Sequence, residues 1–189
     1  MPIFSKPNAI VYLRRSGLII AGKKLTPARY NFLPEHFVNL DIVDVSSFTH
    51  ALRDFFVAHS MKGKHVLMVL DDGVVFMKSV KSDSDIASKG SPEKSTEVFV
   101  EQMPFSPGRR ACLAVKNGTD YSLYGTNAEL YMTVAEALDA SGVAKVLAIT
   151  PAAAYPSENG KQQLAAAVQQ YITDTAVRSS ANFQNAPVM

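Results

Sequence analysis

The stretch SSFTHALRDFFVAHSMKGKHVLMVLDDGVVFMKSV, residues 46–80, predicts an amphipathic helix followed by two strands. Apolar side chains recur in its first part with the period of a helix, so one face can pack on a sheet. Either Ser46 or Ser47 is expected to cap this helix, because a serine hydroxyl can accept a hydrogen bond from an unpaired amide. The strands are expected at 65–70 and 74–80, joined by an Asp-Asp-Gly turn. The apolar face consists of Phe48, Leu52, Phe55, Phe56 and His59.

Upstream of the helix, two short apolar runs flank a turn and predict a β-hairpin. The runs span 9–13 and 18–21, and Gly17 between them can adopt the positive φ that other residues avoid. A long connection that contains two prolines is expected next. Residues 37–43 are then expected to form the third strand, because apolar and polar side chains alternate weakly there.

Downstream of residue 80 the composition changes abruptly. Residues 81–95 are rich in serine, lysine and aspartate and are predicted to form a mobile loop between two lobes. Asn127 is expected to cap a helix that Gly142 ends. The apolar run 143–149 is typical of a central strand buried on both faces. The other expected elements are strands at 111–116 and 121–124 around Asn117-Gly118, helices at 128–140 and 158–178, and a flexible tail at 179–189.

These elements predict a single domain of mixed α/β class, with about eight strands and three helices. The chain has 189 residues, of which 47% are hydrophobic, and this is enough for one core. The only cysteine, Cys112, excludes an intramolecular disulfide and is expected to be a buried small hydrophobe.

Several classes of function lack support in the composition. The net charge of +2 and the scattered basic residues argue against nucleic-acid binding. No run approaches the ~20 apolar residues that cross a bilayer, so no direct membrane insertion is expected. The four histidines lack the spacing of metal ligands, and no glycine-rich phosphate motif or nucleophile motif occurs. No metal, cofactor or catalytic residue is therefore predicted.

Four segments follow one another in an order known from a family of bacterial proteins. They are NLDIVDVSSFTHALRDFF (39–56), KGKHVLMVLDDGVVFMKSV (62–80), EVFVEQMPFSP (97–107) and NAELYMTVAEALDASGVAKVLAITPAAAY (127–155). Together they resemble the first half of the PilM-type actin-like proteins of type IV pilus machines. The resemblance implies half of an actin-like ATPase fold over 1–178. Its first subdomain would comprise about 8–80 and 143–178, with a small subdomain inserted at about 96–142.

The chain departs from the family at the first hairpin. In the family this hairpin carries an Asp-Ile-Gly-Ser type phosphate loop, whereas YLRRSG at 12–17 has no acidic residue. Arg14 and Arg15 are expected to form a solvated hairpin tip rather than a phosphate site. The second lobe, with the adenosine pocket, is also expected to be missing. ATP binding is therefore not expected, and the protein is expected to be a degenerate actin-like ATPase without enzymatic activity.

The resemblance also implies a function and a site. The family docks the N-terminal tail of an inner-membrane partner, PilN, in a groove between the two subdomains. By resemblance, the chain would be a non-catalytic scaffold of a type IV pilus or type II secretion-like platform. It would act in the cytoplasm, held at the inner face of the cytoplasmic membrane by that partner. The matching site is Gln102, Met103, Pro104 and Phe105, with Phe105 as aromatic anchor. Equally, Phe105 can be a core residue at the joint.

Two other functions stay open at this point. One is a small ligand-binding or enzymatic α/β domain with a pocket of converging polar groups. The other is half of a nucleotide site that a second chain completes. Whether the chain forms a homo-oligomer is also left open.

Overall fold

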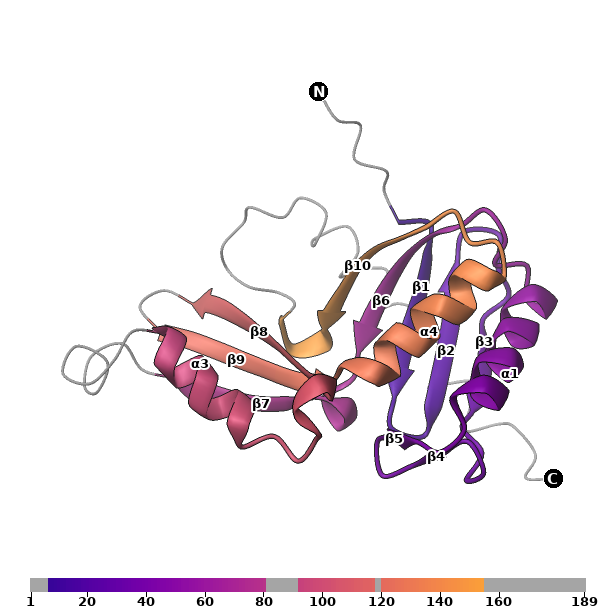
Figure 1. The fold of residues 1–189 in the computed structure, drawn as a ribbon. Coiled ribbons are helices and arrows are strands. Elements are labelled where there is room, and N and C mark those ends of the chain that lie inside the picture. Colours follow the sequence, from indigo (N-terminus) through magenta and orange to yellow (C-terminus); the bar gives the residue numbers. More distant parts are fainter. Residues whose placement is uncertain (1–6, 81–91, 118–119, 155–189) are drawn as a thin grey trace, which may run out of the picture.

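The computed structural model describes residues 7–80, 92–117 and 120–154, which form two β-sheets set side by side (Figure 1). The strands are Ala9–Arg14 (β1), Gly17–Gly22 (β2), Ala28–Asn31 (β3), Phe37–Val38 (β4), Asp41–Ile42 (β5), His65–Leu70 (β6), Phe76–Val80 (β7), Arg110–Asn117 (β8), Asp120–Asn127 (β9) and Lys145–Pro151 (β10). The larger sheet has the strand order β10-β6-β1-β2-β3, and the smaller has the order β7-β9-β8. The strands β4 and β5 form a separate two-stranded ribbon.

The larger sheet is built around β1 and β6, because both strands are almost continuously apolar. β1 pairs antiparallel with β2 and parallel with β6, which in turn pairs parallel with β10. The predicted hairpin is confirmed. A Cβ on Gly17 would lie 2.1 Å from the carbonyl oxygen of Tyr30 on β3, so only glycine fits beside that strand.

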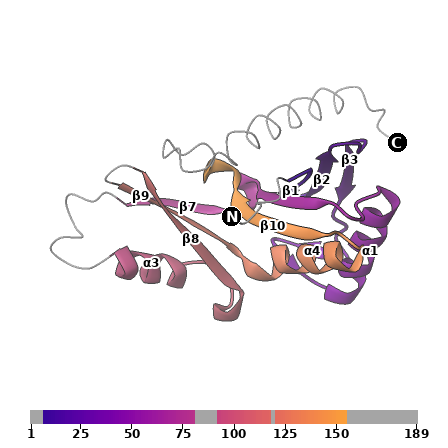
Figure 2. The same cartoon turned by 90° about the horizontal axis from the view of Figure 1, so that it is seen from above.

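Two helices cover one face of this sheet (Figure 2): α1 spans Val45–Ala58 and α4 spans Ala128–Ala140. Both helices were predicted, and their apolar stripes bury the side chains that a helical period brings together. The buried residues of α1 are Phe48, Leu52 and Phe56, and those of α4 are Leu130, Thr133, Val134, Ala137 and Leu138.

The smaller sheet carries the third helix, α3, which spans Pro92–Glu101 and lies on the same side as α1 and α4 (Figure 2). Phe99 of α3 and Met103 just beyond it pack on Gly125 of β9. A Cβ on Gly125 would lie 2.6 Å from the Met103 sulfur, so the helix approaches the sheet closely because this residue has no side chain.

The chain passes between the sheets twice. On the first passage, Asp72–Val74 forms one turn of 3₁₀ helix, and β6 and β7 therefore lie in different sheets. The turn at Asp-Asp-Gly was predicted correctly, but the strands it joins do not pair with each other. The second passage runs from β9 directly into α4. The Thr126 hydroxyl donates to the Val74 carbonyl at 2.6 Å, which ties the two passages together.

Two predictions upstream of α1 were wrong. Residues 37–43 do not form the third strand of the sheet. They form the β4–β5 ribbon, in which Asn39 and Leu40 turn with φ of 51° and 70°. The third strand is β3, in a segment that was predicted to be a connection.

The second wrong prediction is the cap of α1 at Ser46 or Ser47. The cap is Asp44, whose carboxylate accepts from the Ser47 amide at 3.0 Å. This hydrogen bond holds the pKa of Asp44 below its usual value.

Two further predictions need correction downstream, and the number of strands differs slightly from the expected one. Residues 81–91 of the loop predicted at 81–95 lie outside the described residues, whereas 92–95 belong to α3, which begins at Pro92, a residue that suits the first turn of a helix. The run 143–149 is not a central strand, because β10 is an outer strand of the described sheet and its side chains are mostly half-exposed. The predicted mixed α/β class is confirmed, and the described residues hold ten strands where about eight were expected, because β3 and the β4–β5 ribbon were not foreseen as separate strands.

The subdomain boundaries also differ from those expected. β7 belongs to the smaller sheet, although it was assigned to the first subdomain, and α4 packs on α1 rather than on the inserted part. We use the term small subdomain for β7, α3, β8 and β9, and main subdomain for the other described elements. The predicted helix at 158–178 and tail at 179–189 lie outside the described residues. Among the described helices, none has the length and apolar character needed to span a membrane.

Candidate functional site

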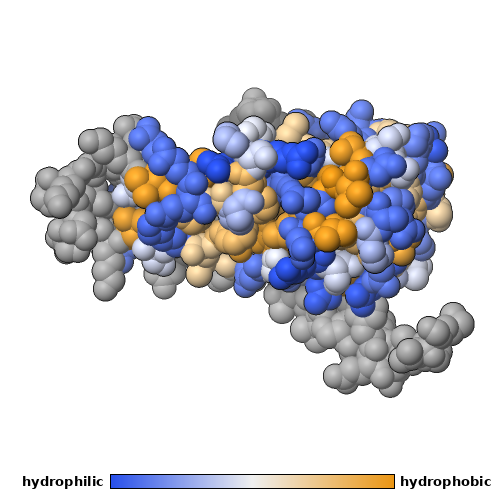
Figure 3. All heavy atoms as spheres, turned by 60° about the horizontal axis from the view of Figure 1, so that its bottom comes forward, coloured by the Kyte–Doolittle hydropathy of each residue, from blue (hydrophilic) through white to orange (hydrophobic). Residues whose placement is uncertain are grey.

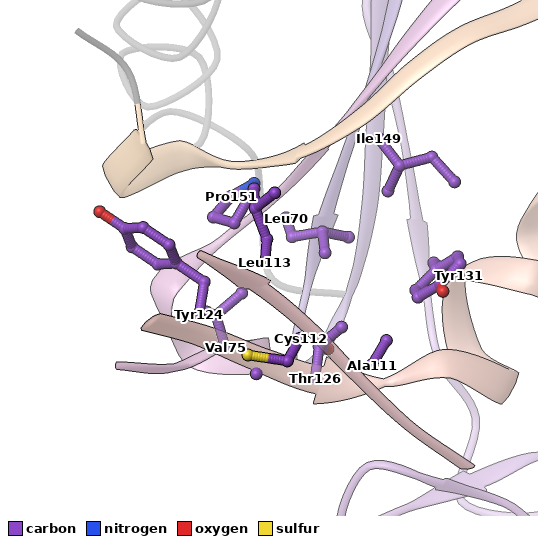
Figure 4. A pocket seen from close by; sticks show the side chains of 11 residues that line it. Leu70, Val75, Ala111, Cys112, Leu113, Tyr124, Thr126, Tyr131, Ile149 and Pro151 are labelled. Carbon is purple, nitrogen blue, oxygen red and sulfur yellow. The ribbon is translucent and has the colours of Figure 1, made fainter. Parts of the chain in front are cut away.

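A groove lies where the two sheets meet, with a cavity of about 200 Å³ (Figure 4). The walls come from β6 and β10 of the main subdomain, from β8 and β9 of the small subdomain, and from the first turn of α4. Nearly all of the lining side chains are apolar or aromatic. They belong to Leu70, Val75, Ala111, Cys112, Leu113, Tyr124, Thr126, Tyr131, Ile149 and Pro151, with Gly125 between them.

The alternation of side chains along β9 explains which face of the small sheet forms the groove wall. Gly125 faces α3, since a side chain there would meet Met103. Its neighbours Tyr124 and Thr126 must point to the opposite face, away from α3. Leu113 of β8 lies directly opposite Tyr124 in the antiparallel register and shares that face. The small sheet thus turns one face to α3 and the other to the groove.

An apolar row crosses the groove face of the small sheet. The register pairs Tyr124 of β9 with Leu113 of β8 on one side and with Met77 of β7 on the other. Leu113 is 42% exposed and Met77 is 61% exposed, whereas Tyr124 between them is buried. An apolar side chain of a bound segment could pack against this row in the way that neighbouring side chains on adjacent strands pack against each other.

Few polar groups in the groove are free to bind a ligand. The Tyr124 hydroxyl donates to the carbonyl of Ala153 at 3.3 Å, and the Thr126 hydroxyl donates to that of Val74. Burial raises the pKa of the Cys112 thiol, which disfavours its reactive thiolate form. The groove is therefore suited to hydrophobic contact rather than to nucleophilic or acid–base chemistry.

Two outer strands border the groove, and they differ in their readiness to pair with a further strand. β10 has an irregular register between Val146 and Ala148 and ends at Pro151, which has no amide proton. Bulges and prolines protect a sheet edge from pairing. β8 pairs with β9 in an uninterrupted register of eight residues. Among the described residues, the backbones of Cys112 and Ala114 on the outer side of β8 form no hydrogen bond to a segment beyond β9.

Polar contacts fasten the small subdomain to the main one beside the groove. Asn127 caps α4 by accepting from the Glu129 amide at 3.0 Å, and its side-chain amide donates to the Leu40 carbonyl at 2.9 Å. Arg109 lies between two carboxylates: its Nε is 3.2 Å from Glu129 and its Nη1 is 3.6 Å from Asp41. The β4–β5 ribbon therefore braces the joint.

The hairpin tip, where the resembled family carries its phosphate loop, is a tight turn. Arg14 and Gly17 pair directly, so only two residues form the turn. Behind it, the Tyr12 hydroxyl donates to the Asp71 carboxylate at 2.8 Å, and the Gly73 amide donates to the same carboxylate at 2.9 Å. Burial and this carboxylate raise the pKa of Tyr12 well above its usual range. The tip thus presents arginine side chains backed by an acidic group, not a cradle of amides.

The predicted site residues lie at the end of α3 and do not line the groove. Met103 and Phe105 are buried in the small subdomain, and Phe105 packs edge-on against Phe76 with ring centroids 5.6 Å apart. Gln102 and Pro104 are exposed on the surface. The structure thus gives Phe105 the core position that was the alternative to an aromatic anchor. That this segment contacts a partner stays a prediction, carried only by Gln102 and Pro104.

The groove residues were missed at the sequence level because they come from distant parts of the chain. The three strands of the small sheet were predicted, with β8 and β9 on either side of the Asn117-Gly118 turn, but nothing in the sequence shows that β7 pairs with β9 or that this sheet lies beside β6 and β10. Among the described residues, no cluster of three or more potential metal ligands occurs. The valines at 38, 43 and 45 are exposed. On the face that Figure 3 shows, hydrophobic residues occur in separate patches among hydrophilic ones. Such patches alone do not mark a site.

The sequence matches no family model and no curated protein. Among solved structures, the chain is similar to a PilM-PilN type IV pilus biogenesis complex, with a TM-score of 0.50 and 13% identity. The match covers 76% of this chain and 47% of the other, so the chain spans about half the length of that neighbour.

Two weaker similarities were also found. One is to the cytoplasmic domain of EpsL, an inner-membrane component of the type II secretion system of Vibrio cholerae, with a TM-score of 0.48 and 10% identity over 76% of this chain and 56% of the other. The other is to a Bacteroides thetaiotaomicron protein of actin-like ATPase fold and unknown function, with a TM-score of 0.39 and 14% identity over 81% of this chain and 56% of the other. At such identities a likeness concerns the fold alone. The chain has the mixed α/β fold of about half an actin-like ATPase.

Proposed function

We propose that the groove between the two sheets binds a short, extended, apolar segment of a protein partner. The chain would then act as a non-catalytic scaffold. The observation that carries this proposal is the pair of apolar groove residues Leu113 and Tyr124, which face each other across β8 and β9, with β8 as an outer strand of the small sheet. A bound strand gains affinity from backbone hydrogen bonds along an edge and specificity from alternate side chains that enter apolar pockets.

The size and the lining of the groove favour a peptide over a small-molecule ligand. Pockets that enclose a ligand of drug size have volumes of about 300–1,000 Å³ and a few converging polar groups. The cavity here is about 200 Å³, which suits one or two side chains, and its Tyr124 and Thr126 hydroxyls already donate to backbone carbonyls. A small ligand-binding or enzymatic domain is the weaker alternative for this reason.

A structural neighbour supports the choice of partner. One of the solved structures with a similar fold is a complex between PilM and PilN. The sequence resemblance to PilM-type proteins points in the same direction. We therefore propose a PilN-like inner-membrane protein as partner, whose tail reaches the cytoplasmic side, and a scaffold role in a type IV pilus or type II secretion-like platform. In this role the chain acts in the cytoplasm at the inner face of the membrane.

The groove proposal predicts that Leu113→Asp weakens peptide binding by about tenfold or more, because the substitution places a charge in the centre of an apolar contact. Octapeptides would be selected from a random display library on the intact chain, and their affinities measured by calorimetry. Val57→Asp is the matched control, since Val57 is exposed on α1 and does not line the groove. Peptides that bind both variants equally well, or a library without binders, would contradict the proposal.

A second prediction concerns nucleotides. The intact chain is expected to show no heat of binding with magnesium and ATP at micromolar concentrations. The two-residue tip between Arg14 and Gly17 offers no phosphate cradle, and the Asp71 carboxylate behind it would repel phosphate. Calorimetry with ATP and with ADP measures this directly. A saturable heat that depends on magnesium would refute the assignment as a non-catalytic protein and favour a nucleotide site shared with a second chain.

A further inference from the structure

A set of polar contacts joins the two subdomains outside the groove, and none of the residues that form them lines the groove. Arg109 belongs to the small subdomain, in the short 3₁₀ helix Pro107–Arg109 just before β8. Its guanidinium lies between Asp41 of the β4–β5 ribbon and Glu129 of α4, both in the main subdomain. Oε2 of Glu129 is buried and makes no hydrogen bond to the described residues, so the charge of Arg109 is what offsets its burial.

The β4–β5 ribbon holds an unusual backbone at this contact. Leu40 has a φ of 70° and Asn39 has a φ of 51°, in the left-handed region that a bulky side chain such as leucine rarely adopts. The surroundings hold Leu40 there, because its side chain is buried and its carbonyl accepts from Asn127. Backbone strain of this kind persists only where neighbouring contacts stabilise it, and it is common at functional sites.

The ion pair between Arg109 and Glu129 and the groove lie on nearly opposite sides of the first turn of α4. Successive residues of an α-helix are rotated by about 100°, so Glu129 and Tyr131 point roughly 200° apart around α4. Glu129 contacts Arg109, whereas Tyr131 lines the groove. In the described part of the chain, two passages cross from one sheet to the other, and the hydrogen bond from Thr126 to Val74 ties them together. A movement about these passages that lengthens the Arg109 contacts also changes the width of the groove.

We propose that Arg109, through Asp41 and Glu129, is a positioning residue that holds the two sheets at the angle at which the groove accepts its peptide. This inference rests on the proposed function, because it assigns to the joint the control of affinity at the same groove. Arg109 is not among the residues that line the groove, so its removal changes the angle between the sheets and not the chemistry of the lining. The partner's affinity is thus set partly from outside the groove.

The first part of the test measures the angle without any partner. Spin labels on Val98→Cys in α3 and Val57→Cys in α1, in a Cys112→Ser background, report the distance between the subdomains by pulsed electron resonance. Both positions are exposed. Arg109→Met keeps the aliphatic stem without the charge and is expected to broaden or shift the distance distribution. Arg109→Lys, which keeps a positive charge, should give a distance distribution close to that of the parent chain. Arg53→Met, which removes an exposed ion pair within α1, should leave it unchanged.

The second part measures the affinity of the selected octapeptides for the same variants without labels. Arg109→Met is expected to weaken binding by about two- to fivefold, since a partly exposed ion pair contributes up to about 1 kcal/mol. An unchanged distance distribution, or a changed distribution with unchanged affinity, would overturn the inference. If no octapeptide binds the parent chain, the proposed function fails, and the coupling inferred here fails with it, while the distances still show whether Arg109 sets the angle.

Discussion

Phe48→Ala is expected to lower the free energy of unfolding by about 3–5 kcal/mol, the range measured for deletion of a buried phenylalanine ring. Phe48 is completely buried between α1 and the sheet. Its ring lies 5.1 Å from that of Phe32, edge-on, and 6.1 Å from that of Phe37, in a stacked arrangement. The substitution therefore removes both apolar burial and aromatic contacts, and it leaves a cavity that rigid strands on one side cannot close.

Urea unfolding followed by circular dichroism measures this loss, with Val57→Ala as the matched control. Val57 lies on the same helix but is 57% exposed, so its truncation should change the free energy of unfolding by no more than about 0.5 kcal/mol. Because small domains are stable by only about 5–15 kcal/mol, Phe48→Ala is expected to bring the chain close to unfolding. A loss below about 1 kcal/mol would show that Phe48 does not anchor α1 on the sheet.

Phe48 also illustrates what the sequence could predict. The helices α1 and α4 and the hairpin β1–β2 are specified locally, by side-chain period, caps and turn residues, and all three were predicted. The cap of α1 was misplaced by two or three residues because Asp44 and both serines can accept from an amide. Local patterns identify an element more reliably than they locate its end.

The features that were missed depend on contacts between distant segments. β3 is four residues long and alternates in exposure, and it becomes a strand only by pairing with β2. The run at 143–149 is as apolar as a central strand, yet the order of the strands in the described sheet places β10 at its edge. An apolar run predicts that a segment is buried, but it does not show which other segments bury it or whether the strand lies at the centre or the edge of a sheet.

The groove shows the same limit more strongly. Leu113, Tyr124 and Met77 become neighbours only through the register of three strands, of which β7 and β8 are separated by α3. The sequence resemblance placed the site in the EVFVEQMPFSP segment (97–107), because that segment carries one of the motifs shared with the family. The groove proposed here lies on the opposite face of the small sheet, where the residues are individually ordinary.

Phe105→Ala distinguishes the two roles proposed for that segment, and we expect a loss of about 3–5 kcal/mol in the free energy of unfolding. Phe105 is 7% exposed and packs against Phe76, while Arg110 Nε donates to the Phe105 carbonyl at 2.6 Å. Its ring thus stabilises the small subdomain from the side of α3. Thermal and urea unfolding measure the effect, and Pro104→Ala, at an exposed neighbouring position, is the control.

Binding separates the roles further. Under conditions in which Phe105→Ala is still folded, its affinity for groove-selected octapeptides should change far less than that of Leu113→Asp, because the Phe105 ring faces α3 and Leu113 faces the groove. An aromatic anchor would show the reverse: a stability close to that of the parent chain and a loss of more than about 1 kcal/mol in binding. That outcome would move the site from the groove face to the segment at the end of α3. The burial of Phe105 and the exposure of Leu113 favour the groove.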